Sequence, residues 1–265
     1  MMSTHRPRDH HRARRDGASQ EGALVIEFAE ISVGSGGIAR CVACGAPEPR
    51  VLRASAQIVA EIDARTLGWN TGPGPNFAFV GTEPFAHPEL PALVAAAVAA
   101  GAQRIRLRTD AGALAIPGNA AGVIHAGVRQ VEVVLLGGDA SIHDALAGRA
   151  GLFDAALEGL RAFSSAALAV DAHVAVCAFI PVCAHNLTQL PAAVSACASA
   201  GAVSAVLSMP AALSGSSAAR EWIGAALDTG TVNGVWVSVQ GVAADTLPRS
   251  PLYARSPTST LGGAR

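Results

Sequence analysis

The sequence predicts an α/β fold in which parallel strands are joined by helical crossovers. Three observations lead to this prediction. Short apolar runs recur along the chain, segments with helical spacing of apolar residues separate them, and glycine-rich or polar stretches follow them. Because parallel strands need long, right-handed crossovers, this alternation favours either a doubly wound open sheet or a barrel, complete or partial.

Each expected strand is a short apolar run bounded by turn residues. The run 76–80 follows a Gly/Pro/Asn cluster and stops at Gly81. In the run 104–108, Arg residues alternate with Ile105 and Leu107, which predicts a strand with one exposed face. The expected strands are 25–31, 76–80, 104–108, 130–136, 169–182 and 202–208, with 232–239 as a possible last strand.

Each expected helix lies between two of these runs. The helix that starts near Leu90 has Pro88 close to its start and Gly101 just past its end, the usual asymmetry of helix termini. A weaker helix is interrupted by Pro117-Gly118. The expected helices are 51–65, 90–98, 111–127, a helical segment within 141–163, one that begins near Pro191, and 216–228.

The domain organisation follows from composition. Residues 1–22 hold several Arg and His residues without apolar periodicity, which predicts a disordered basic tail. Residues 23–244 carry the strand and helix patterns and are expected to form one barrel-like unit. Residues 245–265 are rich in Pro, Ser, Arg and Gly, which predicts a disordered C-terminal tail.

Composition and charge narrow the possible partners and compartment. All 19 basic residues are Arg, and the net charge of −1 argues against a nucleic-acid partner, which would require a broad basic surface. The five cysteines are an odd number, and no secretory signal opens the chain, so a reducing, cytoplasmic location is expected. The uncharged span 186–219 is broken by Gly201 and Pro210, so we expect no membrane segment there.

Candidate functional residues gather at the carboxyl ends of the expected strands. Both open α/β sheets and barrels place their chemistry at these ends. The residues concerned are Cys41 and Cys44, the turn Gly81, Thr82, Glu83 and Pro84, the pair Thr109-Asp110, the stretch Gly137-Gly138-Asp139, and Cys183.

Cys41 and Cys44 are spaced so that both thiolates can face one metal ion or cluster. Two thiolates do not complete a site, because an iron–sulfur cluster or a structural zinc takes three or four protein ligands. Cys183, at the end of the fifth expected strand, could supply a further thiolate. The alternative is that Cys41 and Cys44 are buried thiols without a metal.

Three stretches resemble the core of the radical S-adenosylmethionine (radical SAM) superfamily. Residues 40–44 match the last two cysteines of the Cys-x3-Cys-x2-Cys loop of that family, and residues 81–90 resemble its Gly-Gly-Glu-Pro turn and the run that follows. The block 133–153 resembles the fourth strand exit and the following helix in family members that modify peptides or other small substrates. Together the three stretches fall within 25–208.

The resemblance implies a partial (β/α)6 TIM-like barrel of the radical SAM type. It implies a [4Fe-4S] cluster bound by Cys41 and Cys44, and S-adenosylmethionine (SAM) bound at the turn formed by Gly81, Thr82, Glu83 and Pro84. In the family, reduction of the cluster cleaves SAM to a 5′-deoxyadenosyl radical, which abstracts hydrogen from the substrate.

The chain departs from the family pattern at four positions. Gly37 stands where the first cysteine is expected, and Ala43 replaces the usual aromatic residue. Thr82 replaces the second glycine of the turn, and Val134 lies where a serine is common. Each change removes a cluster ligand or another contact, which indicates a diverged and weakly catalytic or non-catalytic chain that acts with a partner in modifying a peptide or small molecule.

Two other readings stay open from the sequence. In the first, the chain is an active radical SAM enzyme whose cluster is completed by another ligand, such as Cys183. In the second, it is an unrelated α/β barrel enzyme with Cys41 or Cys44 as nucleophile, although no base is evident nearby. The pair His143-Asp144 is interpreted as a structural helix-start pair, with Asp144 in the first turn.

Overall fold

The computed structural model describes residues 28–36, 50–69, 74–170 and 172–242. Seven strands form one sheet, and each pairs in parallel with its neighbour in the order of the chain. They are β1 (Ala29–Ser32), β4 (Asn76–Val80), β5 (Arg104–Thr109), β6 (Val128–Val134), β7 (Ala175–Pro181), β8 (Ser204–Ser208) and β9 (Trp236–Gln240). The order β1-β4-β5-β6-β7-β8-β9 leaves β1 and β9 as edges, so within the described residues the barrel is partial.

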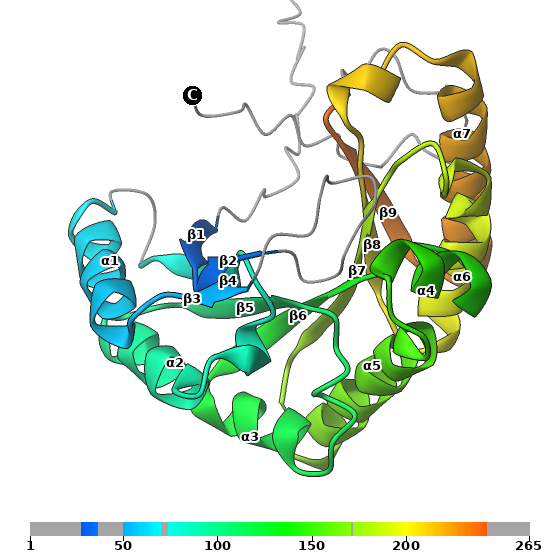
Figure 1. The fold of residues 1–265 in the computed structure, drawn as a ribbon. Coiled ribbons are helices and arrows are strands. Elements are labelled where there is room, and N and C mark those ends of the chain that lie inside the picture. Colours follow the sequence, from blue (N-terminus) through cyan, green and yellow to red (C-terminus); the bar gives the residue numbers. More distant parts are fainter. Residues whose placement is uncertain (1–27, 37–49, 70–73, 171, 243–265) are drawn as a thin grey trace, which may run out of the picture.

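Helices cover the outer face of the curved sheet (Figure 1). The helices are α1 (Ser55–Leu67), α2 (Leu90–Ala99), α3 (Asn119–Ala126), α4 (Ala140–Ala147), α5 (Leu152–Ala169), α6 (Leu190–Ser199) and α7 (Ser217–Asn233). Short 3-10 turns, η2 (Pro84–Ala86), η3 (Leu187–Gln189) and η4 (Ala211–Leu213), follow β4, β7 and β8. This arrangement confirms the predicted fold class, a partial TIM-like barrel.

The main core lies between the outer face of the sheet and the helices. Alternate strand residues, such as Phe77, Phe79, Ile105 and Leu107, are fully or almost fully buried in it. Full burial of a side chain of this size contributes about 1.5–3 kcal/mol relative to exposure. The other residues of each strand therefore face the inside of the barrel, which we call the lumen.

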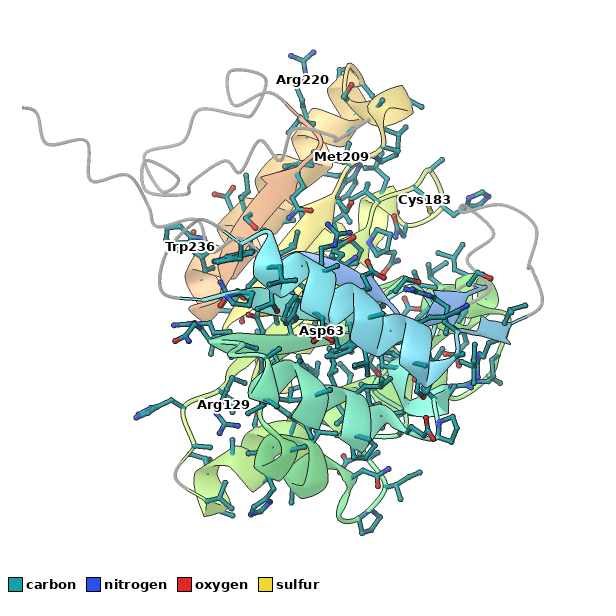
Figure 2. The ribbon with its side chains drawn as sticks, turned by 90° about the vertical axis from the view of Figure 1, so that its left-hand side faces the viewer. Asp63, Arg129, Cys183, Met209, Arg220 and Trp236 are labelled. Atoms are coloured by element: carbon teal, nitrogen blue, oxygen red, sulfur yellow. The ribbon has the colours of Figure 1, made fainter. Side chains whose placement is uncertain are left out.

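The two ends of the barrel carry different residues. Cys183 and Met209 follow β7 and β8 at the carboxyl end, whereas Arg129 and Trp236 lie near the amino ends of β6 and β9 (Figure 2). A small antiparallel pair, β2 (Gly34–Ser35) and β3 (Val51–Leu52), flanks the carboxyl end of β1. The candidate residues that were expected at strand ends, as far as the structure describes them, therefore lie at one end of the barrel, the carboxyl end.

Some expected boundaries were wrong. The helix expected over 111–127 begins only at Asn119, because Gly118 has a φ of +88° and the segment before it forms turns. The strand expected from residue 169 begins at Ala175, because α5 continues to Ala169. The helical segment within 141–163 is two helices, which Gly148 and Gly151 separate with φ values of +65° and +78°.

Within the ranges described, no helix combines the length and the apolar character needed to cross a membrane. The segment 186–219, which carries no charge, forms η3, α6, β8 and η4 with their connections, and the start of α7. The predicted tails, 1–22 and 245–265, lie outside the described residues, so the proposed domain boundaries stay predictions.

Candidate functional site

The turn after β4 packs closely against the chain segment after β1. Gly81 has a φ of +100°, and a Cβ atom there would lie 2.4 Å from the Gly34 carbonyl oxygen and 2.5 Å from the Ser32 hydroxyl. Only glycine fits this backbone conformation and this approach without strain. The absence of a side chain at Gly81 therefore lets Ser32 and Gly34 pack directly against the turn.

Glu83 joins this turn to the end of the neighbouring strand, β5. Its carboxylate accepts hydrogen bonds from the Thr109 hydroxyl (2.7 Å), the Asp110 backbone N–H (2.7 Å) and the Phe85 backbone N–H (3.1 Å). Burial raises the pKa of Glu83 to about 7, and the negative charge of Asp110 adds to this effect, while the three donors oppose it. Glu83 therefore acts as an internal brace, and its oxygens are engaged within the protein.

Thr82 lies between these two anchoring residues and is fully buried. Its hydroxyl has no hydrogen-bond partner among the described residues. A buried hydroxyl without a partner is costly, so such a group marks a place where a further partner is expected. This is the position at which the sequence departs from the glycine of the family turn.

The residues after β5 form a strained turn beside Glu83. Ala111 has a φ of +62°, which is unfavourable for a residue with a side chain. The Thr109 hydroxyl accepts a hydrogen bond from the Ala111 N–H (2.9 Å). Gly159 of α5 lies so close that a Cβ atom there would be 2.2 Å from the Ala111 carbonyl oxygen. The fold thus holds this turn from two sides.

The stretch after β6 is built by side-chain hydrogen bonds to the backbone. Asp139 caps α4 by accepting from the Ile142 N–H (3.0 Å), so the expected place of Asp144 in the first turn was wrong. Asp144 instead accepts from the N–H groups of Gly151 (2.6 Å) and Phe153 (2.9 Å), which ties the start of α5 to α4. Asp144 is therefore a structural residue.

His143 is equally structural. Its Nδ1 atom accepts from the Leu136 N–H (3.2 Å), and its ring meets Phe153 edge-on at 5.5 Å. Burial lowers the pKa of His143 to about 4, although Asp144 opposes this, so the ring is neutral at pH 7. These contacts agree with the structural interpretation of the pair.

The five cysteines differ in their surroundings. Cys41 and Cys44, like Gly37, lie outside the described residues. Cys183 is buried in a small apolar cluster at the carboxyl end of β7, together with Val134, Leu136, Leu146, Ala147 and Leu152. Among the residues described, no group of three or more His, Cys, Asp or Glu side chains could hold a metal ion.

Cys197 and Cys177 are both buried, but only Cys197 belongs to the main apolar core. Burial raises the pKa of Cys197 to about 12. Cys177 faces the lumen, where its sulfur accepts from the Ser204 hydroxyl (2.9 Å) and the Gln130 amide (3.4 Å). Burial raises the pKa of the Cys177 thiol.

An ion cluster in the lumen is the main feature that the sequence did not reveal. Arg106 Nη1 contacts Glu132 Oε1 (2.5 Å), and Arg108 Nε donates to Glu132 Oε2 (2.9 Å). Side-chain exposures are 16% for Arg106, 21% for Arg108 and 4% for Glu132. Of the strand face that was predicted to be exposed, only Arg104 is exposed, because Arg106 and Arg108 look into the barrel. The available signal in the sequence was Glu132, a carboxylate between Val131 and Val133 in a predicted buried strand.

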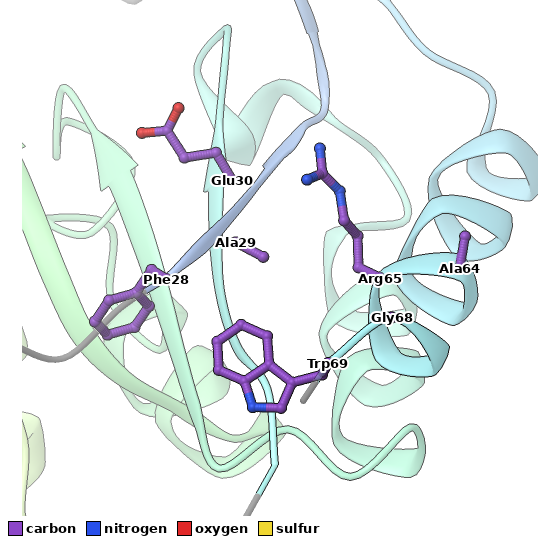
Figure 3. A pocket seen from close by; sticks show the side chains of 7 residues that line it. All are labelled: Phe28, Ala29, Glu30, Ala64, Arg65, Gly68 and Trp69. Atoms are coloured by element: carbon purple, nitrogen blue, oxygen red, sulfur yellow. The ribbon is translucent and has the colours of Figure 1, made fainter. Parts of the chain in front are cut away.

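A cavity of about 480 Å³ lies beside the edge strand β1. It is lined by Phe28, Ala29, Glu30, Ala64, Arg65, Gly68 and Trp69. In Figure 3, Phe28 and Glu30 project from one side of the strand. Arg65 of α1 and Trp69, which follows α1, lie on the other side. The indole N–H of Trp69 is buried and has no partner among the described residues.

The comparisons with known proteins give a structural likeness only. No protein-family model and no curated protein matches the sequence. The fold is similar to that of SuiB from Streptococcus suis bound to the precursor peptide SuiA, with a TM-score of 0.60 and 12% identity, over 86% of this chain and 50% of that one. SuiB bound to S-adenosylmethionine gives a TM-score of 0.57 and 13% identity, over 88% and 53%.

At these identities the likeness shows the fold. The chain spans about half the length of SuiB. The comparison supports the fold expected from the sequence resemblance, while the cofactors, substrate and partner of this chain belong to the proposals below.

The described residues fit one of the two implied cofactors in part. The turn after β4 exposes the Gly81 backbone at the carboxyl end of the sheet and leaves the Thr82 hydroxyl without a partner among the described residues. Backbone groups on such a turn can bind the amino and carboxylate groups of a ligand like SAM. The side chain of Glu83 does not fit that role, because its oxygens are already engaged.

Proposed function

We propose that this chain is a SAM-binding barrel of the radical SAM type with an incomplete cluster loop, and that it acts with a partner in the modification of a peptide. The observation that carries this proposal is the turn Gly81–Pro84, which is held at the carboxyl end of β4 by Gly34 on one side and by Thr109 and Asp110 on the other. A turn braced in this way is preorganised for a ligand. The likeness to SuiB, seen with SAM and with a precursor peptide, supports the choice of ligand and substrate class.

Each part of the proposed site has a separate role. The Gly81–Pro84 backbone would hold the methionine part of SAM, and Glu83 would keep the turn fixed against β5. Cys41 and Cys44 would bind iron. When bound, SAM and a reduced cluster supply the radical chemistry that removes hydrogen from a substrate. Gly37 in place of a third cysteine is the reason for proposing weak catalysis, or none, by the chain alone.

The alternative is an active enzyme whose cluster takes Cys183 as a further ligand. Cys183 lies at the correct end of the barrel, but its thiol packs in an apolar cluster. It would have to leave that cluster to reach iron. A Cys183→Ser variant separates the two versions, because only the alternative predicts that this variant loses iron.

The SAM site is tested by anaerobic equilibrium dialysis with labelled SAM. We expect wild-type protein to bind SAM and the Gly81→Ala variant to bind it at least about tenfold more weakly, because the turn cannot keep its position. Gly101→Ala is the matched control, since Gly101 also has a positive φ but lies at the other end of the barrel with open space around it. Absence of SAM binding to the wild-type protein, or equal loss in both variants, contradicts the proposed site.

A further inference from the structure

The lumen holds two guanidinium groups against one buried carboxylate. Arg106 and Arg108 both pair with Glu132, which is 4% exposed. A second carboxylate, Glu30, lies 3.5 Å from Arg108 but is 57% exposed. Because exposed ion pairs contribute only about 0–1 kcal/mol, Glu30 neutralises Arg108 weakly. The buried part of the cluster therefore carries an excess of positive charge.

The same two guanidinium groups have donors to spare. Each guanidinium offers five N–H donors. Glu132 takes donors from both arginines, and the Arg106 Nε group is buried without a partner among the described residues. Phe28 lies under the Arg106 guanidinium at 4.0 Å, and Phe179 lies under that of Arg108 at 4.2 Å. Stacking fixes the plane of a guanidinium and leaves its N–H edge available to an acceptor.

The cluster is placed where a ligand can approach it. Arg108 and Glu132 are register partners on β5 and β6. Phe28 and Glu30 lie at the edge strand β1, touch the two arginines, and also line the cavity of Figure 3. The cluster thus borders an open edge of the barrel. Glu30 is an exposed and weakly held carboxylate next to Arg108, and a carboxylate of a ligand could take its place.

We infer that Arg106 and Arg108 form a binding site for a carboxylate of the substrate, an acidic side chain of a peptide, and that this carboxylate displaces Glu30. Two arginines with fixed planes suit a carboxylate, which accepts two parallel N–H bonds. Glu132 accepts from both guanidinium groups and so holds them next to each other. That the ligand is the substrate rests on the proposed function, whereas the carboxylate site itself rests on the cluster alone.

The probe is a capped glutamate, N-acetyl-L-glutamate methylamide, titrated by calorimetry at pH 7 and low salt. The matching capped glutamine differs only in lacking the carboxylate charge. We expect the wild type to bind the glutamate probe saturably and to bind the glutamine probe at least about tenfold more weakly. Arg108→Gln should weaken glutamate binding by about tenfold or more, and Glu30→Gln should tighten it by about threefold.

Arg104→Gln is the control, because Arg104 lies on the same strand but is exposed. It should leave binding unchanged. If Arg108→Gln does not fold, binding of the glutamate probe is measured with Arg108→Lys instead. Lysine keeps the charge but loses the planar pair of donors, so binding should still weaken. Folding of each variant is checked by thermal unfolding.

A purely structural ion cluster gives a different pattern, in which the variants change stability but not binding. The inference is therefore overturned if the wild type does not bind the glutamate probe, if both probes bind equally, or if Glu30→Gln and a folded Arg108 variant bind as the wild type does. SAM binding, measured on the same samples, separates failure of this site from failure of the proposed function.

Discussion

The hydroxyl group of Thr109 donates a 2.7 Å hydrogen bond to the carboxylate of Glu83, and this bond links the end of β5 to the turn after β4. The backbone N–H of Asp110 donates to the other oxygen of the same carboxylate. Two adjacent strand ends are therefore fixed to each other by one buried side chain. The proposed SAM turn depends on this link for its position.

Removal of the Glu83 carboxylate should destabilise the protein. In Glu83→Ala, three donors lose their acceptor, and we expect the free energy of unfolding to fall by about 2–4 kcal/mol. Urea denaturation at pH 6 measures the change. Glu221→Ala, at an exposed site on α7, is the control and should change stability by less than about 0.5 kcal/mol. An equal effect of both variants would show that Glu83 does not brace the turn.

The raised pKa of Glu83 predicts a particular pH dependence of stability. The folded protein holds this proton up to about pH 7, whereas the unfolded chain releases it near 4.5. The stabilising contribution is therefore complete below about pH 4.5 and is lost as the pH rises through 7.

This dependence is measured as the difference in free energy of unfolding between wild type and Glu83→Gln, which removes the titration of Glu83 and keeps that of other groups. From pH 4.5 to 8, the difference should shift against the wild type by up to about 3 kcal/mol. A constant difference, or one that favours the wild type more strongly as the pH rises, would mean that the three donors keep Glu83 ionised in the folded state.

The close contact of Gly81 with Gly34 predicts that Gly81 tolerates no side chain. Gly81→Ala combines an unfavourable φ with a clash against backbone, so its free energy of unfolding should fall by about 2–4 kcal/mol. Gly101→Ala has a similar φ of +92° but meets nothing within 4 Å. It should cost only about 1 kcal/mol, from its φ alone. Chemical denaturation measures the free energy of unfolding of both variants, and the difference between them is the cost of the clash. An equal loss of stability in the two variants would show that the clash costs nothing.

The cluster in the lumen should be sensitive to loss of its carboxylate. Glu132→Ala leaves two guanidiniums without their shared partner, and we expect a loss of about 3–5 kcal/mol in the free energy of unfolding. The exposed pair Arg161–Glu158, at 3.5 Å, provides the control, since Glu158→Ala should cost below about 1 kcal/mol. A small effect of Glu132→Ala would mean that water or other groups solvate the two arginines.

The parts of the molecule that depend on local pattern could be predicted from the sequence. Apolar runs and helical spacing predicted the alternation of strands and helices, and the turn at Gly81 was placed at a strand end. Contacts that depend on neighbouring strands could not be predicted. The alternation in β5 shows that Arg106 and Arg108 share one face, but only the closure of the sheet decides whether that face meets solvent or the lumen.

Contacts between residues far apart in the chain could not be predicted from the sequence either, because they depend on which strands are neighbours. Thr109 and Glu83 are 26 residues apart in the chain, and they meet only because β4 and β5 are neighbours in the sheet. Likewise, the turn at Ala111 packs against Gly159 of α5, a helix that comes much later in the chain. A single sequence carries no local signal for either contact.

Anaerobic reconstitution with iron and sulfide tests the proposal that this chain supplies an incomplete set of cluster ligands. Iron per chain is counted, and SAM cleavage is assayed, for the wild type and for Gly37→Cys. We predict less than one cluster per wild-type chain, no SAM cleavage by that chain, and a gain of iron in Gly37→Cys. About four irons per wild-type chain, together with SAM cleavage by the isolated protein, would show that the cluster site is complete.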